Sequence, residues 1–253
     1  MFEVTVEDSF AAGHYLRNYK GKCENPHGHN YKIRVTLAGA ELDKAGLLLD
    51  FKDLREVMKH VIERLDHKMI NDIEPFTAIN PSAENLAKYF YDQSNVRLRQ
   101  VTNGRVRVKD VTVFETATCG AHFDGREYRI WKDLGFDSAI RLRLAPAGDA
   151  RGGVHGHSYR LRLHLAAPLD TVRGWTIDFG DVKALFAPIF DRLDHHPLHE
   201  LPDVAEGGAA AILHWVRAQA QPELPQLERI DLYETPGCGA LLRWGAVPAA
   251  LPV

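Results

Sequence analysis

Apolar residues recur at helical spacing in two separate stretches of the chain. In each stretch six apolar positions fall on one side of a 3.6-residue turn, as on the buried face of an amphipathic helix. Asp50 and Asp178 directly precede these stretches, where a carboxylate can accept hydrogen bonds from the backbone N–H groups of a helix start. We predict two capped helices, the second kinked at Pro188, and a further helix after Ser82 that residues 209–219 mirror weakly. The two apolar sets are Phe51, Leu54, Met58, Val61, Ile62 and Leu65, and Phe179, Val182, Phe186, Ile189, Phe190 and Leu193.

Outside these helices the apolar period changes to two, which is typical of half-buried antiparallel strands. Each half of the chain is therefore predicted to run strand, strand, helix, helix, strand, strand. This order indicates an α+β fold in which two helices cover one face of a four-stranded antiparallel sheet. The strand segments are Phe2-Val4-Val6, Ile33-Val35-Leu37, Leu161-Leu163-Leu165, Val106-Val108, Val111-Val113 and Ile230-Leu232.

Four sequence landmarks occur twice, in the same order and with closely matched spacing. Chance similarity would not preserve order and spacing together, so the pattern indicates a tandem repeat. We place the boundary near Asp124-Gly125, which gives two domains, residues 1–124 and 125–253. The paired landmarks are HGHNYKIRVTL (27–37) with HGHSYRLRLHL (155–165), LLLDFKDL (47–54) with WTIDFGDV (175–182), ERLDHKMI (63–70) with DRLDHHPL (191–198), and ETATCG (115–120) with ETPGCG (234–239).

Composition and charge narrow the class of protein. The 253 residues are 45% apolar and 26% charged, which is ordinary for a globular protein. A net charge of −3 offers no broad basic field for a nucleic acid. We see no signal peptide and no apolar run of the roughly 20 residues that a membrane span needs. The three widely separated cysteines do not suggest a disulfide framework, so we expect a cytoplasmic protein without nucleic-acid or membrane partners.

His14, His27 and His29 have the spacing of a metal site. His27 and His29 lie two apart on a predicted strand, so both rings project from one sheet face, and Gly28 between them leaves the ligands uncrowded. His14 lies on the preceding strand of the same hairpin. Three neutral imidazoles with an open fourth position are typical of catalytic zinc, which we favour over iron or copper because nothing indicates redox chemistry. The alternative is an ordinary surface pair of histidines, the more common outcome for such spacing alone.

Cys23, Asp66 and His67 form a candidate acid–base set. Cys23 lies four residues before His27, and nearby positive charge would lower the pKa of its thiol. His67 follows Asp66 at the predicted end of a helix, where the helix dipole and the carboxylate stabilise an imidazolium. Such groups together can move a proton from one atom to another. The alternatives are a helix-end cap for Asp66 and His67, and a small buried apolar role for Cys23.

Six motifs of the first half together resemble the 6-pyruvoyltetrahydropterin synthase / 6-carboxytetrahydropterin synthase family, whose members share the tunnelling fold. The resemblance implies that the chain is a tandem pair of tunnelling-fold units. The motifs are FAAGH (10–14), CENPHGHNY (23–31), LLLDF (47–51), RLDHKMIN (64–71), NPSAENLA (80–87) and FETATCG (114–120). The implied roles are Zn²⁺ binding for His14, His27 and His29, proton transfer for Cys23, Asp66 and His67, pterin anchoring for Glu115, and a substrate contact for Ser82, which stands where the family has threonine.

The implied substrate is 7,8-dihydroneopterin triphosphate. The spacing Cys-x-x-x-His-Gly-His resembles the carboxy branch, which serves queuosine synthesis and forms 6-carboxy-5,6,7,8-tetrahydropterin with loss of acetaldehyde and triphosphate. The alternatives are a pyruvoyl product formed by triphosphate elimination, and side-chain cleavage by a third branch that uses a glutamate near Glu24. A pterin-binding scaffold without catalysis and a GTP cyclohydrolase are the other candidates, the latter with a metal set that this spacing does not supply. Arg17, Lys20 and Lys22 are candidates for binding the triphosphate.

The second half lacks two residues of the implied set. Ile140 stands where His14 does, and Arg151 stands where Cys23 does, an exchange that a mere packing role for the cysteine would hardly tolerate. We predict a catalytically silent copy that completes a homo-oligomer, with three tandem chains forming a pseudo-hexamer. The alternative is that the retained aspartate–histidine pair completes the site of another chain. The retained residues are His155, His157, Asp194, His195 and Glu234.

Overall fold

The computed structural model describes residues 1–204 and 207–245 of the chain. Within these residues the chain forms four α-helices and eight β-strands, and neighbouring strands pair antiparallel. The predicted α+β class with an antiparallel sheet is therefore confirmed. The chain divides into two compact units that follow the two repeats except at one segment.

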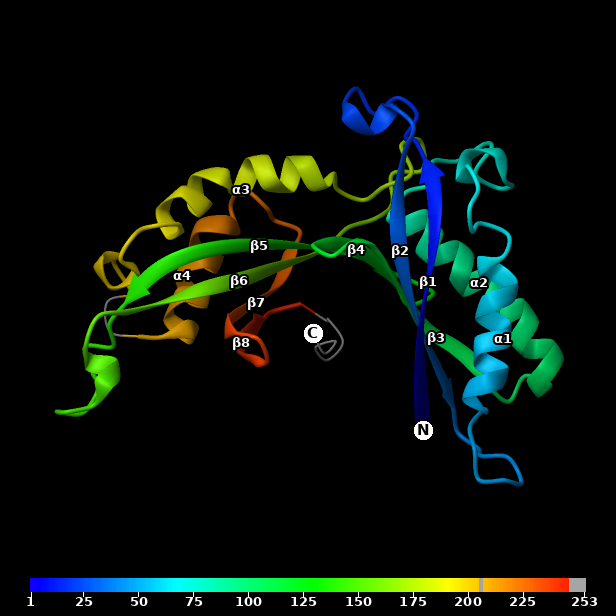
Figure 1. Ribbon diagram of the computed structural model, residues 1–253, viewed down its shortest axis with the longest axis horizontal. Coiled ribbons are helices and arrows are strands. Elements are labelled where there is room, and N and C mark those ends of the chain that lie inside the picture. The colour runs from blue at the N-terminus through cyan, green and yellow to red at the C-terminus, as the bar shows by residue number, and fades with distance from the viewer. Residues whose placement is uncertain (205–206, 246–253) are drawn as a thin grey trace. The chain divides into compact units, whose positions relative to one another are not determined.

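The first unit comprises Met1–Ile130 together with Ala167–Thr176. Its helices and strands are β1 (Phe2–His14), β2 (His27–Gly39), α1 (Phe51–Ile62), α2 (Ala83–Thr102), β3 (Arg107–Thr116) and β4 (Cys119–Phe123), with short 3-10 helices at Lys22–Glu24 and Ile70–Asp72. The strands lie in the order β1-β2-β3-β4. Figure 1 shows α1 and α2 side by side next to these strands, and both helices contact them.

The second unit takes residues Trp131–Ala166 and the chain from Ile177 onward. Its helices and strands are β5 (Tyr128–Ile140), β6 (His155–Ala166), α3 (Phe179–Leu193), α4 (Ala209–Ala220), β7 (Leu227–Thr235) and β8 (Cys238–Arg243), with 3-10 helices at Ala150–Gly152 and Leu198–Glu200. The strands lie in the order β5-β6-β7-β8, and α4 contacts α3, β7 and β8. The element order of the first repeat thus returns in the second.

The helices begin where the sequence predicts. Asp50 accepts a hydrogen bond from the backbone N–H of Lys52 at 2.7 Å, and Asp178 accepts from the N–H groups of Gly180 and Asp181. Each carboxylate satisfies N–H groups that have no partner inside the helix, so these aspartates fix the starts of α1 and α3. The hydroxyl of Ser82 does the same for α2, whereas α4 follows Gly208 without a side-chain cap.

The buried face of α1 differs from the predicted one at its first position. Phe51 is 56% exposed, and the buried residues begin with Leu54 and include Val57. Phe51 is the first residue of α1, and at this end of the helix its side chain faces solvent and not the strands. In α3 the helix continues through Pro188, whose missing N–H leaves one backbone hydrogen bond unmade.

A bulge in β3 explains a change of phase in its apolar pattern. Thr36 pairs with Asp110 and the next residue, Leu37, pairs with Val108, so Lys109 is an extra residue in the strand. An extra residue shifts the side-chain alternation by one position. The two predicted segments around Val108 and Val111 therefore belong to one strand.

The two cores repeat each other in detail. The rings of Phe10 and Tyr31 stack with centroids 5.0 Å apart, and those of Phe136 and Tyr159 stack at 4.9 Å. The residues with no exposed surface include Ile33, Val35, Leu37, Leu54, Met58, Leu86 and Phe90 in the first unit, and Leu161, Leu163, Leu165, Val182, Leu193, Ile212 and Val216 in the second.

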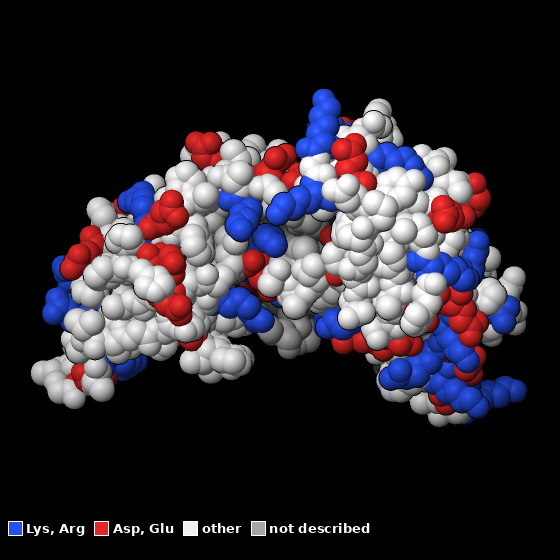
Figure 2. All heavy atoms as spheres, turned by 45° about the horizontal axis from the view of Figure 1, so that its top comes forward, with Lys and Arg blue, Asp and Glu red and all other residues white. Residues whose placement is uncertain are grey.

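No helix among the described residues is long and apolar enough to cross a bilayer. On the face that Figure 2 shows, Lys and Arg side chains are intermixed with Asp and Glu.

Candidate metal centre

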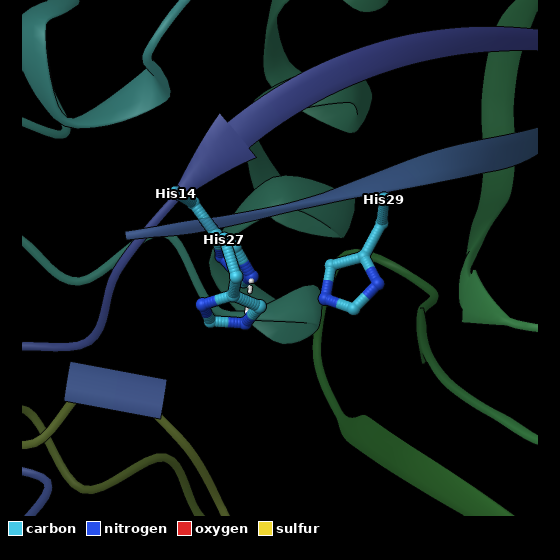
Figure 3. Close-up of side chains that lie close together, drawn as sticks. All are labelled: His14, His27 and His29. Carbon is cyan, nitrogen blue, oxygen red and sulfur yellow. Dashed lines mark hydrogen bonds between the residues drawn. The ribbon is translucent and has the colours of Figure 1, made fainter. Parts of the chain in front are cut away.

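The β1–β2 hairpin brings three histidines together. In its antiparallel register His14 lies opposite His27, and Ala12 lies opposite His29. Residues directly opposite each other point to the same face, and so do residues two apart on one strand. The three rings therefore project from the same side of the hairpin, as Figure 3 shows. Their possible ligand atoms all lie within 4.8 Å of one another.

Backbone carbonyl groups orient two of the rings. His14 donates from Nδ1 to the carbonyl oxygen of Pro81 at 3.0 Å, and His27 donates from Nδ1 to that of Asn25 at 2.8 Å. A carbonyl oxygen can only accept, so each Nδ1 carries the proton and each Nε2 presents its lone pair. The two Nε2 atoms lie 3.1 Å apart. Two lone pairs at this separation are an arrangement that a shared cation would stabilise.

Burial favours the neutral form of two of the imidazoles. Burial, aided by the neighbouring histidines His27 and His29, lowers the pKa of His14 to about 4, although the hydrogen bond to Pro81 acts in the opposite direction. Burial also lowers the pKa of His29, with His27 adding to the effect. Neutral imidazoles are the form that binds a metal ion. The three residues thus fit a divalent metal with at least one open coordination position.

Glu115 borders the trio at the end of β3. Its Oε1 lies 3.5 Å from Nε2 of His14 and 3.6 Å from Nε2 of His29. Tyr31 lies under the same site, where its ring packs edge-on to His14 and His29. Burial raises the pKa of Tyr31 well above its usual range, and the negative charges of Glu115, Cys119 and Cys23 raise it further. The carboxylate that the resemblance assigns to a pterin is therefore adjacent to the metal ligands.

Gly28 has a different role from the predicted one. A side chain there would not crowd the histidines, because a Cβ would lie 3.2 Å from the backbone oxygen of Ala12. Its missing side chain instead allows β1 and β2 to approach closely on the face opposite the rings. Gly156 has the same surroundings in the second repeat, where a Cβ would lie 3.1 Å from the oxygen of Ser138.

Cys23 lies in the middle of the 3-10 turn Lys22–Glu24, between β1 and β2. It is half-buried and forms no disulfide. Its carbonyl oxygen accepts from the backbone N–H of Leu16 at 2.8 Å, which closes the turn above the hairpin.

Asp66 and His67 lie along the edge of β1 that faces away from β2. The side chains contact each other at 2.9 Å, from Nδ1 of His67 to Oδ2 of Asp66. Asp66 also accepts from the backbone N–H of Ala11, and the N–H of His67 donates to the Ala11 oxygen at 2.7 Å. The hydrogen bond from His67 lowers the pKa of the Asp66 carboxyl. His67 lines a surface pocket of about 510 Å³ together with Gly28 and His29.

Ser82, the predicted substrate contact, uses its hydroxyl within the protein. It accepts from the N–H of Asn85 at 3.1 Å and donates to the carbonyl oxygen of Gly174. The sequence analysis missed the neighbouring Pro81, whose carbonyl orients His14, and also Glu84, which is buried. Both residues lie in the NPSAEN motif (80–85), which the resemblance had already singled out. The hydrogen bond from His14 to the Pro81 carbonyl spans 67 residues, however, and no local sequence pattern indicates such a contact.

The second repeat carries the predicted exchanges at equivalent places. Because Gly156 faces Ser138 as Gly28 faces Ala12, Ile140 occupies the position of His14, and it is only 2% exposed. Arg151 is the middle residue of a 3-10 turn, as Cys23 is, and pairs with Asp149. The rings of His155 and His157 remain, with centroids 5.4 Å apart.

The aspartate–histidine pair of the second repeat keeps its geometry. Nδ1 of His195 lies 3.0 Å from Oδ1 of Asp194, and the N–H of His195 donates to the oxygen of Asp137 at 2.7 Å. His67 and His195 share a positive φ, 55° and 56°. Within residues 1–204 and 207–245, the one group of three side chains able to hold a metal ion is that of the first repeat.

Comparison with known proteins assigns the family. A family model described as 6-pyruvoyl tetrahydropterin synthase matches residues 3–126 and again residues 129–244. A 6-carboxy-5,6,7,8-tetrahydropterin synthase of Aquifex aeolicus is 34% identical over 122 residues, covering 40% of this chain and 75% of that protein. A 6-pyruvoyl tetrahydrobiopterin synthase of Homo sapiens is 38% identical over 129 residues, covering 45% of this chain and 85% of that protein.

Among solved structures, 6-pyruvoyl tetrahydropterin synthase of Caenorhabditis elegans is 31% identical and covers 46% of this chain and 91% of its own, with a TM-score of 0.39. The two relatives compared by sequence each match less than half of the chain, whereas the family model matches both repeats in turn. The resemblance seen in the motifs is thereby confirmed. The chain belongs to the 6-pyruvoyl tetrahydropterin synthase family, whose tetrahydropterin synthases are lyases, and it carries the family unit twice.

Proposed function

We propose that the chain is a zinc-dependent pterin synthase that converts 7,8-dihydroneopterin triphosphate to 6-carboxy-5,6,7,8-tetrahydropterin, with loss of acetaldehyde and triphosphate. The observation that carries the proposal is the trio of imidazoles beside Glu115. We assign catalysis to the first domain, residues 1–124, and a silent role to the second, residues 125–253. Each is one tunnelling-fold unit with two helices on one face of four strands, and we expect the protein in the cytoplasm.

His14, His27 and His29 would hold the metal, which would polarise the side-chain hydroxyls of the substrate and acidify the adjacent C–H. Glu115 would accept two N–H bonds from the pterin edge and so orient the ring beside the metal. Cys23 would take the acidified proton as a thiolate, and an aspartate–histidine pair would hold a proton for return to the product. Near the substrate, Ser82 would contribute its backbone position, because its hydroxyl is already engaged.

The choice of the carboxy branch rests on the spacing of Cys23 and the His-Gly-His motif. A pyruvoyl product is the second candidate, since relatives of both names match the chain at similar identity. The deciding experiment incubates zinc-loaded protein with 7,8-dihydroneopterin triphosphate and identifies the pterin by mass. Acetaldehyde with a 6-carboxy product supports the proposal, and a pyruvoyl product supports the second candidate. No turnover would instead favour a pterin-binding protein or scaffold.

Cys23→Ala tests the acid–base role. We expect turnover to fall by about 10²- to 10⁴-fold, because general acid–base catalysis contributes about that much. Metal content should be unchanged, since the trio does not include the cysteine. Cys238→Ala is the matched control, because this exposed cysteine belongs to the second repeat. Full activity of Cys23→Ala would exclude the cysteine from the reaction.

The partner we propose is a second copy of the chain, with three chains forming a pseudo-hexamer. Two equivalent loops support it. The carboxylate of Asp43 accepts from the N–H of Ala45 at 2.9 Å, and that of Asp170 accepts from the N–H of Arg173 at 3.0 Å. The second loop leads into residues 173–176, which pack on the first unit, whereas Leu47 of the first loop is exposed. An exposed copy of a docking loop is expected to dock on another chain.

The location of the aspartate–histidine pairs also favours sites shared between chains. Asp66 and His67 lie along the outer edge of β1, where a neighbouring chain can approach. The pair from the second repeat, Asp194 and His195, could equally complete a site with Cys23 of another chain. The double variant Asp194→Ala/His195→Ala separates these cases. Unchanged turnover would eliminate the second-repeat pair.

A further inference from the structure

A short segment of the second repeat lies against the first unit. We name this segment, Arg173–Thr176, the strap. It connects β6 to α3 in the chain, yet it groups with the first unit. Trp175 is 9% exposed, and its ring meets the ring of Tyr19 edge-on at 5.7 Å. The strap is thus packed and not merely adjacent.

The backbone of the strap accepts hydrogen bonds from the loop before α2. Asn80 donates to the carbonyl oxygen of Arg173 at 2.7 Å. Ser82 and Asn85 both donate to the carbonyl oxygen of Gly174, the latter at 3.1 Å. These three donors are all buried, so losing their acceptors would leave buried polar groups unpaired.

A buried carboxylate fastens the far end of the strap. Oε1 of Glu84 accepts from both the backbone N–H of Thr176, at 2.8 Å, and its hydroxyl, at 2.9 Å. Glu84 is 2% exposed, and burial raises its pKa. The same carboxylate would be costly to bury without these two donors.

The loop that the strap holds is also the loop that orients a metal ligand. Pro81 lies between Asn80 and Ser82, and its carbonyl accepts the Nδ1 proton of His14. Asn80 also accepts from the backbone N–H of Arg17 at 2.7 Å, just beyond His14 in the chain. Hydrogen bonds therefore connect the strap to the side chains of Asn80 and Ser82, and the Pro81 carbonyl between these two residues connects to the ring of His14.

We propose that the strap is a positioning element for the metal site of the first repeat. The strap holds the side chains of Asn80 and Ser82, and these two residues hold the Pro81 carbonyl between them. That carbonyl in turn sets the tautomer and the orientation of the His14 ring. The partner that holds the second nitrogen of a metal-binding histidine commonly changes metal affinity about 10- to 100-fold when it is lost. The inference rests on the metal site of the proposed function, and it gives the silent second repeat a task at the active one.

Gly174→Ala tests the proposal, and Gly104→Ala is its matched control. Both glycines have a positive φ, 85° and 80°, so both substitutions strain the backbone alike. A Cβ at Gly174 would lie 2.8 Å from Nδ2 of Asn85 and 3.2 Å from Cβ of Asn80, whereas a Cβ at Gly104 meets nothing within 4 Å. Only the first substitution pushes the strap away from the loop.

The main measurement is the zinc dissociation constant by competition with a coloured chelator. We expect Gly174→Ala to bind zinc about 10-fold or more weakly than Gly104→Ala, and Gly104→Ala to match the wild type. Equal affinity of the two variants would overturn the proposal. Thr176→Val, which removes one of the two donors to Glu84 and keeps the backbone N–H donor, should weaken binding in the same direction by less.

A metal-free measurement separates this inference from the proposed function. Nitrogen-15 shifts of the His14 ring report which nitrogen carries the proton. We expect the Nδ1–H form in the wild type and in Gly104→Ala, and a mixture of forms in Gly174→Ala. If the wild type bound no zinc, the proposed metal site would fail. Unchanged His14 shifts in Gly174→Ala would overturn the positioning role by itself.

Discussion

His14 and Ile140 occupy equivalent positions in the two repeats, and both side chains are buried. In the second repeat, isoleucine fills this buried position with an apolar side chain. It has no nitrogen atom that could serve as the third metal ligand. The remaining pair, His155 and His157, is left with two imidazoles, which is fewer than the three protein ligands typical of catalytic zinc. This one position thus separates a histidine trio from a histidine pair.

This difference predicts the metal content of each repeat. We expect one zinc ion per chain in the wild type, none in His14→Ala, and one in His155→Ala. The measurement is elemental analysis after zinc loading and removal of unbound metal. Two ions per chain, or full zinc in His14→Ala, would contradict the assignment.

A half-buried histidine, His164, lies in an ionic cluster of the second unit. Its Nε2 lies 3.0 Å from Oδ2 of Asp231, which also binds Arg229 through both carboxylate oxygens. Burial lowers the pKa of His164, and the nearby guanidinium groups of Arg229 and Arg162 act in the same direction, against the attraction of Asp231. The folded protein therefore keeps this imidazole neutral at a pH where the unfolded chain would protonate it.

The sign of the pH effect follows from that shift. The folded pKa lies below the unfolded value, so His164 contributes stability above pH about 6.5, and this contribution is lost as the pH falls toward the folded pKa. In His164→Gln the unfolding free energy should fall less steeply between pH 7 and pH 5, by up to about 1.4 kcal/mol per pH unit. Denaturant titrations at several pH values measure this. Identical slopes for both proteins would refute the assignment.

At the scale of elements, the helix starts differ in how they are capped. The carboxylate of Asp178 accepts two backbone N–H groups at the start of α3, whereas α4 starts after Gly208 without a side-chain cap. α2 starts at Ser82, which both caps its helix and holds the strap. The loss of the serine at the equivalent start of the second repeat therefore removed a cap and a docking contact together.

Asp178→Ala should lower the unfolding free energy by about 1 kcal/mol, which is typical for the loss of an N-cap side chain. Asp191→Ala is the control, because this exposed aspartate lies in the same helix far from its start. Denaturant unfolding of both variants provides the comparison. A loss in Asp191→Ala as large as in Asp178→Ala would show that the cap is not the cause.

At the scale of the whole molecule, the two repeats differ in the loops that are available for contact with another chain. The first repeat keeps the metal ligands and an exposed loop around Leu47, and the second supplies the strap that the first unit receives. An interface made by two different surfaces is directional, so successive chains can close into a ring.

Light scattering should therefore find a particle of three chains, each of 28.4 kDa. Leu47→Asp should shift the protein toward single chains, because it places a charge in the proposed contact. Val96→Asp is the control, since Val96 is exposed on α2 in the first unit away from that loop. A stable monomer in the wild type would remove the assembly, and an unchanged Leu47→Asp particle would remove the loop from it.

The sequence by itself determined the element types, their order and the repeat. Apolar spacing is a local property, so it reveals α1 and α3 together with their capping aspartates, Asp50 and Asp178. It also determined the metal trio, because a His-Gly-His motif in a strand fixes two rings on one face. The exchange at Ile140 was visible in the same way.

Only the tertiary structure decided the contacts between distant segments. The bulge at Lys109 depends on pairing with β2, and the place of Asp66 depends on the backbone of Ala11, 55 residues away. The hydrogen bonds of the strap to Asn80 and Glu84 cross more than 90 residues. Such contacts are set by how folded elements meet, and no periodicity within a single segment encodes them.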